Sequence, residues 1–291
     1  MIKTLKNSYL SVGISTHGAE LSSARARDGF EFIRARDGKW GNSAPILFPV
    51  CGRLKNNEYT LGGKRYKMTP HGFILHSDFS VVCERENSLT LTFSSNEESL
   101  KAYPFLLDFT VNYTLDGQTL KSTYAVKNNS SVPMPFMIGL HPAFALPLKE
   151  GAMTDEHKVY FGRCELPVHP LCNGCFVSKS TYTKALTDGA YSVREEEIYE
   201  NDTIVFKDAP NRVRLFTEGS AREVAMEYSP EFSYFCIWKR ADREDKFLCL
   251  EPWTSVPTEG VHDECFDGRD DMFTLSPGEE MSFFCNITFT F

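Results

Sequence analysis

Residues 105–115 have the sequence FLLDFTVNYTL, in which every odd position is apolar and most even positions are polar. Successive side chains of a strand point to opposite faces of its sheet, so this period of two predicts a long strand with one buried face. An Asp116-Gly117 turn follows, and apolar residues return over 120–126. The pattern therefore predicts two long antiparallel strands joined by a tight turn.

Strand signals of this kind extend along most of the chain, and helical signals are few, at 97–103 and 183–189. The acidic run at 195–197 is most simply a solvated segment. No internal repeat or linker rich in Pro, Gly or Ser divides the sequence. We therefore predict an all-β fold, a large antiparallel β-sandwich with few short helices, formed by residues 1–291 as a single domain. The expected strands lie at 59–66 (a hairpin), 79–83, 89–93, 203–207, 212–217, 222–228, 232–238, 246–250 and 283–291.

Composition limits the classes of partner. The net charge of −8 argues against nucleic acid or an anionic membrane surface, because both are bound through basic patches. The N-terminus has no apolar core of signal-peptide length, and no run approaches the roughly 18 apolar residues of a membrane span. These features predict a soluble, cytoplasmic protein that binds neither nucleic acid nor membrane and is a monomer or homodimer.

The nine cysteines show no spacing typical of secreted proteins, so reduced thiols are expected. Cys164, His169, Cys172 and Cys175 form one cluster in the sequence. A zinc site needs four ligands that converge at tetrahedral geometry, and this cluster has no second ligand pair elsewhere in the chain. We interpret it as a loop with free thiols, and we expect no metal and no cofactor.

Two strand ends carry a titratable group directly before a proline. His141 lies in Leu140-His141-Pro142, and Glu251 lies in Leu250-Glu251-Pro252-Trp253. Proline ends a strand ladder and keeps the preceding residue extended, so each side chain is placed where a strand stops. Together they are a candidate general acid and general base. The alternative is two unrelated strand ends, with His141 buried against a backbone carbonyl.

Three further residues are candidates for binding. Arg53 follows Pro49-Val-Cys-Gly, and its guanidinium suits paired hydroxyls or a carboxylate, although a surface arginine explains it equally well. His71 lies between Pro70 and Gly72 in a tight turn. Asp202 precedes an apolar strand, where it could bind a ligand or cap a turn. The sequence has no Gly-x-Ser-x-Gly, P-loop, Gly-x-Gly-x-x-Gly or His-Glu-x-x-His motif.

In this order, the segments resemble the aldose 1-epimerase (galactose mutarotase) family, and within it the shorter LacX-like branch. The resemblance covers nearly the whole chain. It implies a galactose mutarotase-like β-sandwich with a sugar site in a cleft on the sheet, and no cofactor. The residues that carry it are Gly18-Ala19-Glu20-Leu21, Leu47-Phe48-Pro49, Gly52-Arg53, His71-Gly72-Phe73, Gly139-Leu140-His141-Pro142-Ala143-Phe144, Glu251-Pro252-Trp253 and Pro277-Gly278-Glu279.

The resemblance also implies catalytic roles. Glu251 is expected to be the general base and His141 the general acid, with His71 assisting near the ring oxygen. The expected activity is that of an isomerase, a mutarotase that interconverts the α and β anomers of a hexose or related aldose by opening and closing the ring.

Binding roles follow from the same resemblance. Arg53 and Asp202 are expected to hold sugar hydroxyls, and Trp253 could pack on the apolar face of the sugar. Members of the family often have Ala-Arg after His-Gly-Phe, whereas this chain has Ile74-Leu75, which leaves the sugar open. Alternatives are a mutarotase for a hexose 6-phosphate and a carbohydrate-binding protein without turnover. A glycoside hydrolase is disfavoured because it usually needs two carboxylates.

Overall fold

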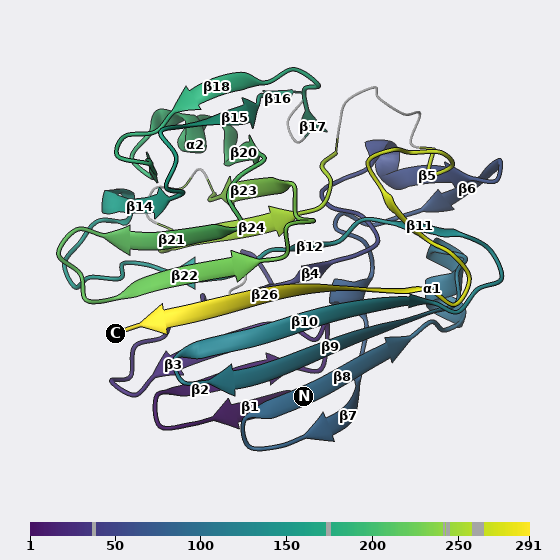
Figure 1. Cartoon of the computed structure of the whole chain (residues 1–291), viewed down its shortest axis with the longest axis horizontal. Coiled ribbons are helices and arrows are strands. Elements are labelled where there is room, and N and C mark those ends of the chain that lie inside the picture. The colour runs from purple at the N-terminus through teal and green to yellow at the C-terminus, as the bar shows by residue number, and fades with distance from the viewer. Residues whose placement is uncertain (37–38, 173–175, 241, 243–244, 258–264) are drawn as a thin grey trace.

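The computed structural model describes residues 1–36, 39–172, 176–240, 242, 245–257 and 265–291. The predicted long strand is present as β9 (Leu107–Asp116), whose side chains alternate between buried and more exposed positions as far as Asp116. It pairs antiparallel with β10 (Thr119–Asn128), and β10 pairs with the C-terminal strand β26 (Glu280–Thr290). Figure 1 shows these three long strands side by side, with β26 in yellow.

These strands are the middle of a nine-stranded sheet that runs across the whole view in Figure 1. One face of each long strand is buried, as the period of two requires. The order of strands is β19 (Ala190–Ser192), β14 (His157–Tyr160), β21 (Arg212–Thr217), β22 (Glu223–Tyr228), β26, β10, β9, β8 (Ser88–Ser94) and β7 (Ser80–Glu84).

A second sheet has shorter strands and carries the residues of interest. Its central strand β24 (Phe247–Trp253) is buried at every position, because both of its faces are covered. The order is β18 (Tyr182–Ala185), β15 (Glu165–His169), β20 (Thr203–Lys207), β23 (Tyr234–Trp238), β24, β12 (Gly139–Leu140) and β4 (Ile46–Leu47), with β13 (Ala143–Ala145) also paired to β24.

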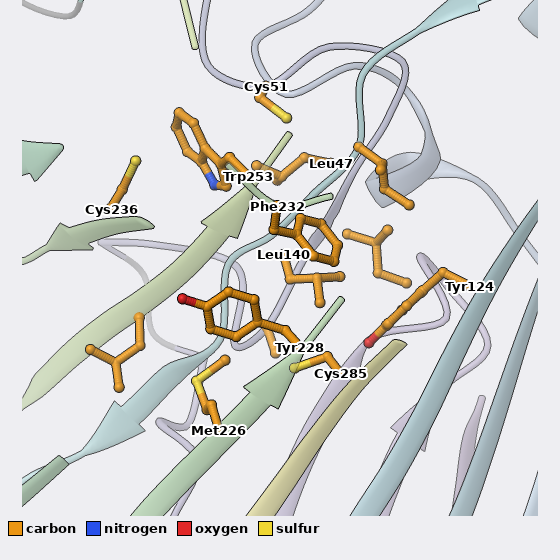
Figure 2. Close-up of a cluster of buried hydrophobic side chains, with 14 of the residues drawn as sticks. Leu47, Cys51, Tyr124, Leu140, Met226, Tyr228, Phe232, Cys236, Trp253 and Cys285 are labelled. Atoms are coloured by element: carbon orange, nitrogen blue, oxygen red, sulfur yellow. The ribbon is translucent and has the colours of Figure 1, made fainter. Parts of the chain in front are cut away.

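The two sheets pack face to face through large apolar side chains. Tyr228 of β22 stacks on Phe235 of β23, with ring centroids 5.7 Å apart. In Figure 2, Tyr124 and Cys285 of the nine-stranded sheet meet Leu140 of the second sheet in one buried cluster. Each such side chain contributes roughly 1.5–3 kcal/mol through burial. The predicted all-β antiparallel sandwich is confirmed, and the prediction that residues 1–291 form one domain stays a prediction.

Smaller elements complete the described part of the chain. The expected helix near 97–103 is α1 (Glu97–Ala102), capped by the Asn96 side chain. The helix expected at 183–189 is wrong, because β18 lies there and pairs with β15. The acidic run at 195–197 is not simply solvated, since it leads into α2 (Glu196–Asn201) and Lys184 binds Glu195 and Glu197. The remaining elements are β1 (Ile2–Lys6), β2 (Leu10–Ser15), β3 (Leu21–Ala26), the pairs β5 (Glu58–Leu61)/β6 (Lys64–Lys67), β11 (Met134–Phe136)/β25 (Phe273–Leu275) and β16 (Leu171–Cys172)/β17 (Phe176–Val177), and 3₁₀ turns at Lys55–Asn57, Ile74–His76 and Thr154–Glu156.

None of the helices in the described ranges is long and apolar enough to cross a membrane.

Candidate active site

Strand β24 brings a carboxylate into the interior. Alternate residues of a strand share a face, so Cys249, Glu251 and Trp253 lie on one face of β24. Glu251 is 1% exposed, and Cys236 of the neighbouring strand is its partner in the register. A carboxylate this deep is costly unless another group shares its proton or charge.

His141 is brought to Glu251 by two short strands on the same side of β24. Gly139 of β12 pairs with Trp253, and Ala143 of β13 pairs with Cys249. His141 therefore occupies the bend between β12 and β13, as its position before a proline predicts. The strand end predicted at Glu251 is wrong, because β24 continues through Pro252 to Trp253. A larger residue at Gly139 would displace its neighbours, because a Cβ there would lie 2.8 Å from Trp253 Cδ1.

The two side chains are in direct contact. His141 Nε2 lies 3.2 Å from Glu251 Oε2, and His141 is 6% exposed. Burial raises the pKa of Glu251 well above its usual value. Burial also lowers the pKa of His141 well below its usual value, and His71 adds to the shift. Both shifts disfavour charge, so the pair holds one proton near neutral pH and titrates as a unit.

Polar atoms around this pair are unpaired. Within the described residues, His141 Nδ1, Glu251 Oε1 and Trp253 Nε1 are buried and make no hydrogen bond. Leaving such an atom unsatisfied costs about 1–3 kcal/mol, and native proteins contain few of them. Three at one place indicate a site that is completed by a ligand.

His71 forms the wall next to His141, with the two rings 5.5 Å apart at their centroids. Its backbone is left-handed, with φ at 65°, and its N–H donates to Gly52 O at 2.7 Å. Gly52 N–H donates in turn to His71 Nδ1 at 3.2 Å. Burial and the nearby Arg53 lower the pKa of His71 to about 4. The ring is therefore neutral at pH 7, and its proton is on Nε2 because Nδ1 accepts.

The turn at His71 also depends on its neighbour Gly72. Gly72 has φ at +80°, and a Cβ there would lie 1.9 Å from Phe48 O. Only glycine fits this close approach of two backbone segments. The dipeptide His71-Gly72 is thus held by geometry as well as by hydrogen bonds.

A cavity of about 300 Å³ opens above these residues. The structure places all six residues singled out from the sequence on its wall, although they come from distant parts of the chain. Trp40 and Trp238 line it too, so all three tryptophans of the chain face one cavity. The lining residues are Trp40, Gly52, Arg53, Pro70, His71, His141, Leu171, Val177, Asn201, Asp202, Thr203, Val205, Trp238, Glu251, Trp253 and Pro257.

Arg53 and Asp202 lie at the cavity but are more exposed than the acid–base pair. Arg53 is an exposed residue, next to Gly52. Asp202 ends α2 in a left-handed conformation, with φ at 59°, and its backbone oxygen accepts from Lys239 N at 2.9 Å. Asp202 therefore both ends a helix and lines the cavity.

Sequence reasoning missed Trp40 and Trp238. The Trp40 ring lies 5.2 Å from both the His141 ring and the Trp238 ring. Trp238 ends the apolar strand β23, but Lys239 follows it instead of a proline, so the pattern that singled out His141 and Glu251 does not apply to it. Trp40 lies in a segment without a repeating pattern.

The Trp40 segment is held from behind. The buried Arg34 lies over the rings of Trp40 and Phe247 and donates to Trp40 O and Asn42 O. Glu20, which is 2% exposed, accepts from the backbone N–H groups of Ser43 and Ala44. These contacts fix the loop that covers His141.

The sequence cluster Cys164, His169, Cys172 and Cys175 is only partly within the described residues. Cys164 is exposed, His169 is buried with Nδ1 2.8 Å from Ser178 O, and Cys172 is half-buried. Cys175 lies outside the described residues. Seven described cysteines are free, at positions 51, 83, 164, 236, 249, 265 and 285.

Comparison with known proteins gives consistent results. A family model described as aldose 1-epimerase matches residues 1–288. Protein LacX of Lactococcus lactis subsp. lactis, in its chromosomal and plasmid forms, is 29% identical over 272 residues, which cover 87% of this chain and 88% of LacX.

Solved structures show the same fold. A galactose mutarotase related enzyme from Lactobacillus acidophilus has a TM-score of 0.92 at 29% identity, covering 100% of this chain and 98% of that one. A galactose mutarotase-like protein from Lactobacillus casei has a TM-score of 0.90 at 25% identity, covering 99% and 100%. Because the family model spans almost the full length, this chain belongs to the aldose 1-epimerase family.

Proposed function

We propose that this protein is a mutarotase that interconverts the α and β anomers of a hexose or related aldose. The observation that carries the proposal is the buried pair of Glu251 and His141, 3.2 Å apart, on the wall of a cavity lined by tryptophans. A site that only bound sugar would have no need of an acid and a base in contact. Membership of the aldose 1-epimerase family supports the same reaction.

The reaction needs one group to remove the proton from the anomeric hydroxyl and another to protonate the ring oxygen. In the proposed mechanism, Glu251 is the base and His141 the acid. The reaction uses the form of the pair in which the shared proton has moved from Glu251 to His141. In that form the raised pKa of Glu251 makes its carboxylate a stronger base than one in water, and the lowered pKa of His141 makes its imidazolium a stronger acid. Each group is typically worth about 10²–10⁴ in rate.

Opening the ring gives the free aldehyde, the C1–C2 bond rotates, and closure occurs on the other face with the two roles exchanged. The shared proton of the pair suits this exchange. Ring opening leaves Glu251 protonated and His141 neutral, so His141 can then act as the base and Glu251 as the acid when the ring closes. Sugar hydroxyls would satisfy the unpaired His141 Nδ1, Glu251 Oε1 and Trp253 Nε1. His71, with its proton on Nε2, is the proposed donor near the ring oxygen.

Recognition is proposed to combine stacking with hydrogen bonds. Trp253, Trp40 and Trp238 offer apolar ring faces to the C–H groups of a sugar. Asp202 and Arg53 would bind hydroxyls at the wall of the cavity. A sugar phosphate would need several cations, and among the described lining residues Arg53 is the only lysine or arginine.

The deciding experiment follows the optical rotation or the NMR anomeric signals of freshly dissolved α-D-glucose and α-D-galactose. We expect the anomers to equilibrate faster with the protein than in buffer for at least one sugar of a panel that includes hexose 6-phosphates. Equal rates across the whole panel would rule out the enzyme. Acceleration only for the phosphates would move the substrate class to sugar phosphates.

A further inference from the structure

Beneath the proposed acid–base pair lies a third potential ligand. Cys249 precedes Glu251 by two residues on the same face of β24 and is fully buried. Ligand atoms of His141, Cys249 and Glu251 all lie within 4.8 Å of one another. The proposed reaction has no use for a thiol here.

These three donors are the types that zinc prefers. Zinc binds imidazole nitrogen, cysteine sulfur and carboxylate oxygen, and catalytic zinc sites commonly have three protein ligands with one position left open. His141 and Glu251 line the cavity, so the open position would face it. We propose that His141, Cys249 and Glu251 bind a zinc ion, and that this ion inhibits the enzyme.

The observed geometry is close to what zinc requires. Two ligand atoms on a tetrahedral zinc lie about 3.5 Å apart, given bonds of about 2.0–2.3 Å. His141 Nε2 and Glu251 Oε2 are already 3.2 Å apart. The ligand atoms of all three residues lie within 4.8 Å of one another, so the Cys249 sulfur must move toward the other two donors to bind the same ion.

Metal binding would change the protonation of the third ligand. The thiol of Cys249 is protonated in the free protein, since burial raises its pKa well above the usual value and the Glu251 charge adds to the rise. A bound metal ion deprotonates a coordinating thiol outright, and the proton is released to solvent.

Zinc would act by occupying the two catalytic groups. The Glu251 oxygen and the His141 nitrogen that bind the metal can no longer take or give a proton. Binding at the triad is independent of activity, whereas the inhibition rests on the mutarotase function proposed above. The experiment therefore has separate arms for binding and for inhibition.

The binding arm titrates the full chain with Zn²⁺ by calorimetry and with Co²⁺ by absorption, in a background in which the exposed Cys83 and Cys164 are serine. We expect one tight site and a cobalt–thiolate charge-transfer band. Cys249→Ala should remove the band and weaken Zn²⁺ binding by about 100-fold or more, since even changes outside the ligand shell cost about 10–100-fold. Cys249→Ser, which keeps the size of the side chain, serves if the alanine variant does not fold.

Cys236→Ala is the matched control. Cys236 is as buried as Cys249 and pairs with Glu251 across the sheet, but its sulfur is outside the triad. This variant should keep both the band and the Zn²⁺ affinity. The site is overturned if the background protein has no tight site, if Cys249→Ala binds as tightly as its parent, or if Cys236→Ala loses as much affinity.

The inhibition arm measures mutarotation with Zn²⁺ and after removal of the metal with EDTA. We expect Zn²⁺ to suppress the rate of the parent protein, EDTA to restore it, and Cys249→Ala to remain active at the same Zn²⁺ concentration. Full activity of a protein that the binding arm shows to be loaded would overturn the inhibition. A protein inactive on every sugar would overturn the mutarotase function, while the binding arm would still decide the metal site.

Discussion

The two large sheets differ in how regular their strands are. In the nine-stranded sheet, β9 and β10 have 10 residues each and β26 has 11, with one alternating pattern of burial along each. In the second sheet, β12 and β4 have 2 residues each, and the chain leaves the ladder at His141-Pro142. A continuous ladder satisfies every backbone group, whereas a broken one can turn polar side chains into a cavity. The regular sheet thus supplies the stability that an interrupted sheet with unpaired polar atoms requires.

If the nine-stranded sheet supplies stability and the second sheet carries the site, changes in the second sheet should mainly affect activity. Glu251→Gln removes the proposed base and keeps the shape of the side chain. We expect the rate of mutarotation to fall by about 10²–10⁴. The melting temperature should stay the same or rise, because the variant no longer buries an ionisable carboxyl. Sugar binding, followed by tryptophan fluorescence, should persist. A large loss of stability in Glu251→Gln would give the carboxylate a structural role instead.

The regular sheet should respond in the opposite way. Leu91 of β8 is fully buried and pairs with Val111 of β9, away from the cavity. Leu91→Ala should lower the free energy of unfolding by about 2–5 kcal/mol, through lost burial and the cavity left behind. Activity per folded molecule should not change. Denaturant unfolding together with a rate measurement at low temperature tests both, and a variant that is stable but inactive would contradict the division.

The same contrast explains what the sequence could reveal. The pattern over 105–115 predicted β9 because a half-buried strand has a strict period of two. The helix predicted at 183–189 was wrong, because pairing of β18 with β15 overrides a weak local preference for helix. His141 and Glu251 were found through the prolines that follow them. Their contact at 3.2 Å could not be predicted from the sequence, since it depends on the pairing of β12 and β13 with β24.

Tryptophans at the site show a second limit of sequence reasoning. Trp253 adjoins a recognised motif, but Trp40 reaches His141 only because Arg34 and Glu20 hold its loop. No local pattern encodes a loop that is fixed by contacts distant in sequence. Asp202 was ambiguous for a related reason, since one residue both ends α2 and lines the cavity.

A smaller effect is expected for a residue that contributes to both stability and activity. Gly139 belongs to β12, and a Cβ there would lie 2.8 Å from Trp253 Cδ1 and 2.9 Å from Cys51 Sγ. Gly139→Ala should cost about 1–3 kcal/mol of stability by overpacking, and should displace Trp253 from its position beside Glu251. The Michaelis constant should therefore rise, and the melting temperature should fall by only a few degrees, as about 1–3 kcal/mol of lost stability implies. Gly41→Ala is the control, because nothing lies within 4 Å of the added Cβ and the backbone of Gly41 is not left-handed.

The smallest expected effect concerns the pH dependence of stability through His71. Its pKa is lowered from 6.5 to about 4 in the folded protein, so between these values the unfolded chain binds more protons. Stability from this group is therefore complete above pH 6.5 and is lost as the pH falls toward 4. Glu251, whose pKa is raised, has the opposite sign, so the wild-type curve alone cannot isolate His71. His71→Asn suits the left-handed backbone and offers an oxygen in place of Nδ1. Its melting temperature should fall less than that of the wild type over this range, and parallel curves would show that His71 is not held neutral by the cavity wall.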